Sequence, residues 1–419
     1  MRHHSWNRRD FIIKPVAALA ASQVVGSFTR LLGQAPETQI PAVHPSSKVI
    51  YRTLGKTGIS LPIVSMGVMN ADVPGLIKRS YELGVRHFDT AASYQQGRNE
   101  QMVGNMIQQM GVRDRVVIST KILRPDFARR GSEAPARVYT PAEVKAHFLE
   151  VFAASQKRLQ MDYVDILYNH ACDSEAQINS EGALDALTQL KREGKTRFIG
   201  VSSHQPELAL GLAMKSGVYD VVLIPFNYTM AHNENLLMMI DKAAKSGIGI
   251  VAMKTQSGGM TPPNPNQTRN LPPESQTAML KWALLHESIT TAIPGYTRYE
   301  HLDQNFTVAS DLTLTAAERD FLDDKKTSAE AQFCHQCGQC RGDCPLGVNI
   351  PVLMRSHMYA VQYSNRQLAT DTLTSFAGSA GLRMCSDCDE CQAKCRNSVD
   401  IAMKIRHLKE LTASRVLTV

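Results

Sequence analysis

The sequence predicts an α/β fold in two parts: a barrel of eight parallel strands, then a small helical domain rich in cysteine. Short apolar runs alternate with segments of helical periodicity eight times between residues 63 and 293, and eight alternating strands are the number that closes a barrel. After residue 329 the strand signal ends, and eight of the nine cysteines fall between Cys334 and Cys395. A chain of 419 residues accommodates a barrel of about 250 residues and a second domain.

The composition is that of an ordinary globular protein. Hydrophobic residues make up 43% of the chain and charged residues 20%, which excludes the disordered and membrane-spanning classes. The net charge is +7, and more than half of it lies in residues 1–35. No basic run is interleaved with aromatic residues, so nucleic acid is not an expected partner.

The N-terminal segment, residues 1–35, resembles a Tat export signal. Arg8 and Arg9 precede a short, weakly apolar run that is too short to span a membrane. Small residues fit a cleavage site just before Pro36. The alternative is an amphipathic or disordered arm with a chance arginine pair. The resemblance implies the Tat translocase as a partner during export, and a periplasmic or otherwise exported location.

The barrel is predicted over residues 50–329, after a linker rich in proline and serine at residues 36–49. It opens with a hairpin whose turn contains Gly55 and Gly58. The eight strands are predicted at residues 63–68, 86–88, 116–120, 163–168, 197–201, 220–224, 248–253 and 290–293.

Helical periodicity separates these strands. One helix face is marked by apolar residues spaced three and one apart, namely Met102, Val103, Met106, Ile107 and Met110. A second amphipathic helix follows Thr140 and Pro141, which suit the N-cap and the first turn.

Four polar residues stand at or just after the ends of three consecutive predicted strands. Asp89 and Tyr94 follow the second strand, Lys121 follows the third and His170 the fourth. Because the carboxyl ends of barrel strands meet at one rim, where barrel enzymes keep their chemistry, we expect the four to converge. A single such residue is explained more simply by a structural salt bridge, but four in order favour a catalytic site.

These four residues match, one by one, the catalytic tetrad of the aldo-keto reductases, and the resemblance extends over about residues 50–310. It implies a nicotinamide-dependent oxidoreductase that reduces a small or sugar-like carbonyl, or oxidises the alcohol. Tyr94 would be the proton donor, because the ammonium of Lys121 lowers the pKa of a phenol that is otherwise about 10. Asp89 would hold Lys121, and His170 would hydrogen-bond the carbonyl oxygen.

The same resemblance implies an NAD(P)H site formed by the later strands. Ser202 and Ser203 lie in the segment that grips the nicotinamide carboxamide in the family, although Ser203 replaces the usual asparagine. Phe226 stands where the family stacks an aromatic ring on the nicotinamide, with a core role as the alternative. Lys254 is placed to meet the pyrophosphate.

The adenosine end of the nucleotide would meet the last strand and its helix. Arg298 and Asn305 belong to this loop and helix, and Arg298 could equally be a solvated surface residue. Gly295 and His301 stand where many members carry Lys and Arg for the 2′-phosphate. The choice between NADH and NADPH therefore stays open.

Two cysteine quartets dominate the second predicted domain, residues 330–419. Each quartet has the spacing C-x2-C-x2-C-x3-C, the bacterial ferredoxin run, in which the fourth cysteine binds the other cluster. The pattern predicts two [4Fe-4S] clusters whose ligand sets are Cys334, Cys337 and Cys340 with Cys395, and Cys385, Cys388 and Cys391 with Cys344. Zinc and disulfides are the alternatives. Zinc usually takes paired C-x2-C knuckles, and such short spacings make poor disulfide staples.

A barrel with this tail resembles the iron–sulfur branch of the aldo-keto reductases. Hydride transfer moves two electrons and a cluster takes one, and no flavin motif is visible between them. The clusters are therefore either structural or serve an electron-transfer partner. The competing hypothesis is an electron-transfer protein whose barrel is a scaffold that binds no nucleotide. Cys172 is interpreted as a packing residue.

Overall fold

The structure is a computed structural model, which describes residues 48–126, 138–256, 274–324, 334, 338–361, 365–374, 381–388, 390–396 and 399–417. The predicted export signal, most of the predicted linker and Cys337 lie outside the described residues. Within the described ranges, no helix is both long enough and apolar enough to cross a membrane.

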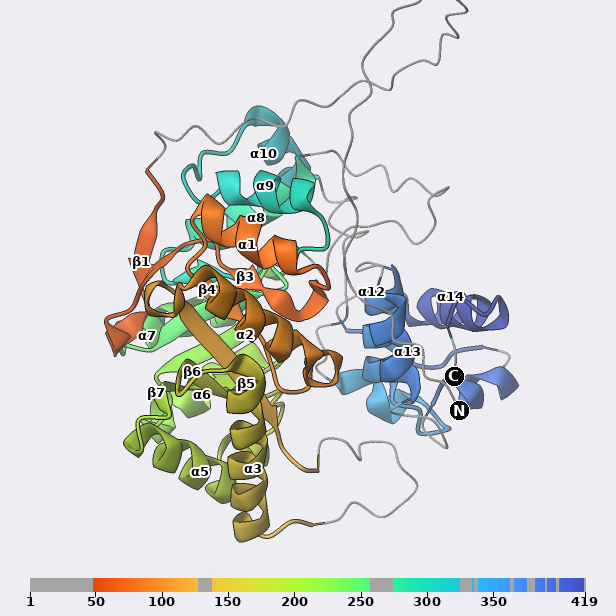
Figure 1. Ribbon diagram of the computed structural model, residues 1–419. Helices are drawn as coiled ribbons and strands as arrows, with labels where there is room; N and C mark the ends of the chain where they lie inside the picture. The colour runs from red at the N-terminus through yellow and green to blue at the C-terminus, as the bar shows by residue number, and fades with distance from the viewer. Residues whose placement is uncertain are drawn as a thin grey trace, which may run out of the picture. The chain divides into compact units, whose positions relative to one another are not determined.

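Eight parallel strands form one sheet, which confirms the predicted barrel (Figure 1). They are β3 (Met66–Gly67), β4 (His87–Asp89), β5 (Val117–Leu123), β6 (Val164–His170), β7 (Thr196–Ser202), β8 (Val221–Pro225), β9 (Gly249–Met253) and β10 (Thr291–Ala292). Each strand pairs with its neighbours in the chain, in the order β3 to β10. Isolated parallel bridges from Val64 to Ala292 and from Gly67 to Gly295 join the first strand to the last.

An antiparallel hairpin of β1 (Tyr51–Thr53) and β2 (Ser60–Pro62) precedes the barrel, as predicted. Its turn residues Gly55 and Gly58 both have positive φ, at 50° and 72°, a conformation that costs glycine little. Leu54 and Leu61 of the hairpin are fully buried and pack into the core inside the barrel. The hairpin therefore closes one end of the barrel.

Helices alternate with the strands as in a βα barrel. They are α1 (Pro74–Leu83), α2 (Arg98–Met110), α3 (Pro141–Leu159), α4 (Glu175–Ile178), α5 (Glu181–Arg192), α6 (Pro206–Ser216), α7 (Glu234–Lys245), α8 (Ser275–Leu285), α9 (Tyr299–Thr307) and α10 (Ala316–Asp323). The last two, α9 and α10, follow the final strand. Thr140 and Glu143 form a capping box at the start of α3, which satisfies backbone donors that a helix start leaves open.

The core of the barrel has an inner and an outer layer, set by the two-residue period of the strands. On β6, Ile166 and Tyr168 belong to the cluster inside the barrel, while Leu167, between them, belongs to the cluster that faces the helices. Leu223 and Val251 are also inside. A polar residue that is separated from an inner residue by an even number of positions along a strand therefore also faces the barrel's interior.

The cysteine-rich tail has a small core of its own. Its helices are α12 (Ile350–Val361), α13 (Arg366–Thr374) and α14 (Ile401–Ala413), with 3₁₀ turns η7 (Gln339–Asp343) and η8 (Leu382–Asp387) at the two quartets. The buried cluster includes Leu353, Ile405 and Leu408 together with Cys340 and Cys385. Packing of two cysteines into this core joins the quartets to the fold of the tail.

Candidate active site

Three neighbouring strands bring the four predicted catalytic residues to one rim. Asp89 ends β4 and His170 ends β6, while Lys121 lies in β5, between them. Asp89 is in register with Ser119, and Lys121 with Tyr168. Tyr94 begins η3 (Tyr94–Gly97), in the loop after β4.

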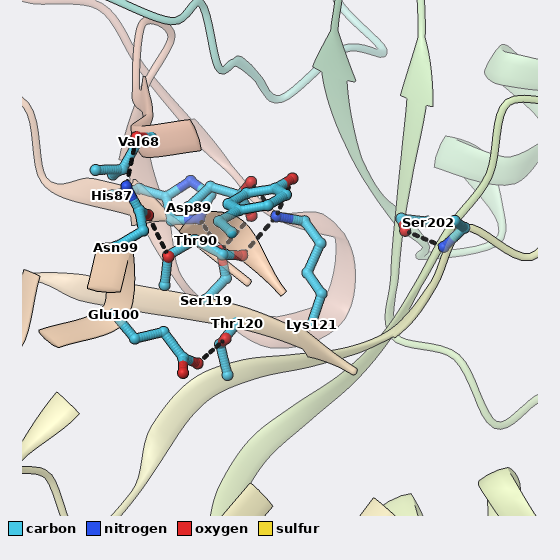
Figure 2. Close-up of polar contacts among 12 residues, drawn as sticks. Val68, His87, Asp89, Thr90, Asn99, Glu100, Ser119, Thr120, Lys121 and Ser202 are labelled. Carbon is cyan, nitrogen blue, oxygen red and sulfur yellow. Dashed lines mark hydrogen bonds and ion pairs between the residues drawn. The ribbon is translucent and has the colours of Figure 1, made fainter. Parts of the chain in front are cut away.

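Lys121 is the centre of the site and is 1% exposed. Its ammonium forms an ion pair with Asp89 and donates a hydrogen bond to the Thr90 carbonyl at 2.6 Å (Figure 2). The same Nζ lies 3.5 Å from the hydroxyl of Tyr94 and 5.0 Å from its ring centre. Burial lowers the pKa of Lys121, and the carboxylate of Asp89 opposes this effect. A cation so close to a phenol favours the phenolate.

His170 faces Tyr94 across the rim. The two rings lie edge to face, with centres 5.9 Å apart and planes at 79°. Burial, followed by the positive charge of Lys121, lowers the pKa of His170 well below its usual value. The imidazole is therefore neutral near pH 7 and has one N–H to donate. Its Nδ1 has no hydrogen-bond partner among the described residues.

A buried polar network supports the ion pair from below and was not predicted from the sequence. His87 contacts Ser119, and Ser119 donates a hydrogen bond to Asp89 (Figure 2). The signal that could have found it is the two-residue period: His87 and Asp89 share one face of β4, and Ser119 and Lys121 share one face of β5.

A second network anchors the outer side of the same strands. Thr90 donates a hydrogen bond to Asn99, whose amide donates to the Val68 carbonyl at 2.8 Å (Figure 2). Thr120 donates at 2.6 Å to Glu100, which is fully buried and accepts a second bond from Arg158 at 2.7 Å. Because Asn99 and Glu100 both belong to α2, this helix fixes the strand ends that carry the site.

Ser202 and Ser203 lie at the end of β7 and make contacts within the protein. The Ser202 hydroxyl accepts a hydrogen bond from the Ala171 amide at 2.9 Å (Figure 2). The Ser203 hydroxyl donates to Asp173 at 3.2 Å. Asp173 also accepts a hydrogen bond from the His204 amide at 2.8 Å, so the loops after β6 and β7 are tied together.

The position of Phe226 does not support the predicted stacking on a nicotinamide. Its ring is fully buried in the outer layer of the core, with centres 5.0 Å from Trp282 and 4.9 Å from His286. The physical reason is the strand period: Leu223 faces the barrel interior, so a residue three positions later faces the helices. The core role is the one its surroundings favour.

The other predicted nucleotide contacts lie after β9 and β10. Lys254 follows β9 with a positive φ of 55°, and burial lowers its pKa to about 8. Beside it, the buried hydroxyl of Thr255 has no hydrogen-bond partner among the described residues. Asn305 is buried on α9 and accepts a hydrogen bond from Gln256 at 2.8 Å, and Arg298 is the N-cap of α9. A cation and an open hydroxyl at a strand end suit a phosphate group.

The tail brings the fourth cysteine of one quartet to the other quartet. Burial is the main cause that raises the pKa of Cys385 to about 11; Lys409 opposes it, and the nearby thiols Cys344, Cys388 and Cys391 act in the same direction as burial. A cavity of about 540 Å³ is lined by Cys395 together with Gln339 and Asp343 of η7, the turn that also contains Cys340 of the first quartet. In the described part of the chain, no three His, Cys, Asp or Glu side chains lie close enough together to hold a metal ion. The spacing of the two quartets, rather than a preformed set of ligands, is what fits iron–sulfur clusters.

Comparisons with known families divide the chain as the fold does. A family model described as the aldo/keto reductase family matches residues 65–280. A second model, described as dihydropyrimidine dehydrogenase domain II, 4Fe-4S cluster, matches residues 314–418. The second match begins before the predicted domain boundary at residue 330 and indicates a 4Fe-4S domain at the C-terminus.

Curated relatives and solved structures resemble the barrel. L-glyceraldehyde 3-phosphate reductase of Escherichia coli O157:H7 is 24% identical, over 64% of this chain and 90% of that protein. L-galactose dehydrogenase of Arabidopsis thaliana is 24% identical over 68% and 95%, and D-threo-aldose 1-dehydrogenase of a Pseudomonas species is 26% identical over 48% and 68%. The holo form of aldo-keto reductase AKR11C1 from Bacillus halodurans has a TM-score of 0.53 at 22% identity, over 66% of this chain and 95% of that one.

Proposed function

The chain belongs to the aldo/keto reductase family, and we propose that it reduces a small sugar-like carbonyl with NADPH or NADH, or oxidises the corresponding alcohol. The family match covers about half of the chain, and it makes the protein an oxidoreductase. The observation that carries the proposed reaction is the position of Lys121 beside Tyr94, at a rim that His170 also reaches. The three relatives above are named for reactions of sugars or a sugar phosphate, which supports the sugar-like substrate.

Each rim residue has one task in the proposed reduction. NAD(P)H, when bound, supplies the hydride. The Tyr94 hydroxyl gives its proton to the carbonyl oxygen as negative charge develops there, and Lys121 stabilises the phenolate that remains. Neutral His170 donates a hydrogen bond to the same oxygen. Asp89 holds the ammonium of Lys121 in place.

The nucleotide is proposed to lie along the loops after β7, β9 and β10. Lys254, Thr255 and Arg298 offer donors for phosphate groups there, and Ser202 and Ser203 lie at the nicotinamide end. This arrangement does not favour the electron-transfer hypothesis with a barrel that binds no nucleotide. The relatives, named as reductases and dehydrogenases, disfavour that hypothesis as well.

The tail is proposed to hold two [4Fe-4S] clusters, with each fourth cysteine bound to the cluster of the other quartet. The electrostatic interaction of Cys344 with Cys385, which Cys388 and Cys391 also contact electrostatically, supports this pairing. Because a hydride moves two electrons together and a cluster accepts one, the clusters are proposed to stabilise the tail. An electron-transfer partner would be needed only if they also exchange electrons.

The proposed function is tested with the purified full-length chain. We expect bound NADPH or NADH to quench the tryptophan fluorescence of the protein. We also expect the protein to consume the nucleotide when glyceraldehyde, glyceraldehyde 3-phosphate or galactose is added. Comparison of the two nucleotides decides the preference that Gly295 and His301 leave open. A chain that carries its clusters but binds neither nucleotide would contradict the proposal.

The twin arginines are proposed to direct export through the Tat pathway, and their replacement should abolish it. In the variant with Arg8→Lys and Arg9→Lys, we expect the protein to stay in the cytoplasm with its clusters, because the translocase reads the paired guanidinium groups. Cell fractionation and immunoblotting measure the distribution. The control is Arg2→Lys, which leaves the pair intact and should be exported. Export of the double variant at the parent level would refute the signal.

A further inference from the structure

A chain of hydrogen bonds leads from inside the barrel to the ion pair at its rim. His87 Nε2 lies 2.9 Å from Ser119 Oγ, and Ser119 Oγ lies 2.6 Å from Asp89 Oδ1. His87 and Ser119 are fully buried, and Asp89 and Lys121 are no more than 2% exposed. Figure 2 labels the four residues in the same polar cluster.

The donors in this series of hydrogen bonds all point the same way, from His87 toward Asp89. A carboxylate only accepts hydrogen bonds, so the single hydroxyl hydrogen of Ser119 points to Asp89. The Ser119 oxygen then accepts from His87, and His87 must carry its proton on Nε2. Burial lowers the pKa of His87 to about 4, so the imidazole is neutral near pH 7 and keeps this tautomer. Its Nδ1 has no hydrogen-bond partner in the described ranges.

We propose that His87 and Ser119 are positioning residues for the proton donor: through Asp89 they hold the Lys121 ammonium beside the Tyr94 hydroxyl. The inference rests on the proposed function of Tyr94. Asp89 has two oxygens, and Lys121 contacts Oδ2 while Ser119 contacts Oδ1. Bonds on both oxygens fix the rotation of the carboxylate, and hence the place of the ammonium that it attracts.

Loss of the hydrogen bonds from His87 through Ser119 to Asp89 would act on Tyr94 in two ways. An Asp89 carboxylate without the Ser119 bond keeps more of its negative charge, which opposes ionisation of the phenol. A carboxylate free to rotate also holds Lys121 less firmly near Tyr94. Both effects raise the pKa of Tyr94 and make it a weaker acid.

Other charged or titratable groups also face this site, and the variants described below leave all of them unchanged. Glu100 and His170 interact with Lys121, Asp165 interacts with His87, and Tyr168 interacts with Asp89. None of them is changed in the variants below, so a shift at Tyr94 reports the chain from His87 to Asp89.

The experiment compares His87→Gln with His87→Met in the full-length protein. The two replacements have nearly the same size, but only glutamine keeps an N–H donor near the position of Nε2. The Tyr94 pKa is measured by ¹³C NMR with tyrosine labelled at Cζ, and the Tyr94 signal is assigned by its loss in Tyr94→Phe. We expect His87→Met to raise this pKa by about 1 and to lower kcat/KM for glyceraldehyde about tenfold, and His87→Gln to restore most of both.

Ser119→Ala is the second variant and removes only one oxygen atom. It should raise the Tyr94 pKa as His87→Met does, and it keeps the proposal testable if His87→Met does not fold. An unchanged Tyr94 pKa in both variants, with only a lower melting temperature, would overturn the proposal and leave His87 a packing residue. A shifted pKa with unchanged reduction would instead support the chain and contradict Tyr94 as the proton donor.

Discussion

Tyr94→Phe is expected to lower kcat/KM for carbonyl reduction by about 10²-fold or more, the usual scale for a general acid. The variant keeps the ring that lies edge to face with His170 and loses only the hydroxyl beside Lys121. Nucleotide binding and the melting temperature should stay close to the parent values. Steady-state kinetics with glyceraldehyde, fluorescence titration with NADPH and thermal melting measure the three quantities.

The pH dependence gives a second check on Tyr94. An acid must be protonated to work, so kcat/KM of the parent protein should fall as the pH rises through the pKa of Tyr94. Tyr94→Phe should lose this decline together with most of its rate. Tyr168→Phe is the control, because it removes a phenol hydroxyl of the same barrel that has no hydrogen-bond partner among the described residues. Parent-like reduction by Tyr94→Phe would exclude the residue as the acid.

Cys344→Ala should cost the protein one cluster and loosen the tail while the barrel stays folded. The parent protein is expected to hold about eight iron atoms, and this variant about four, because Cys344 lies near the second quartet. Cys340 and Cys385 are part of the small core of the tail, and small domains depend on bound metal for stability. Iron analysis, EPR spectroscopy and limited proteolysis of the tail measure these effects.

Two further variants complete this test. Cys395→Ala should remove the cluster of the first quartet and leave that of the second, with an EPR signal distinct from that of Cys344→Ala. Cys172→Ala is the control, since Cys172 is buried in the core of the barrel and should leave the iron content unchanged. Tightly bound zinc in place of iron in the parent protein would end the cluster hypothesis.

The barrel could be predicted because its strands are short, apolar and separated by clear helices. The apolar face formed by Met102, Val103 and Met106 identified α2. The N-cap residue Thr140, followed by Pro141, identified the start of α3. The catalytic residues could be predicted because strand ends of a parallel barrel share one rim, whatever the details of packing.

The directions of side chains could not be predicted from the sequence. Phe226 follows β8 at the expected distance, but the two-residue period turns its ring toward the helices. The network of His87 and Ser119 escaped notice because each residue alone suits a buried strand. Its meaning depends on register, which pairs Asp89 with Ser119 across two strands, and on hydrogen-bond direction, which only the assembled site defines.

The seam between the first and last strands, which closes the barrel, is held by few backbone pairs. β5 and β6 share five paired residues, whereas β3 shares two with β4, β10 shares two with β9, and the first and last strands meet through two isolated bridges at Val64 and Gly67. A Cβ atom at position 67 would lie 2.7 Å from the Ile293 carbonyl, so the two backbones can approach only because this residue is glycine. Local unfolding follows the least paired backbone. Amides along this seam should therefore exchange with solvent well before those of β5 and β6, and the loop after β10 would be released first when the ring opens.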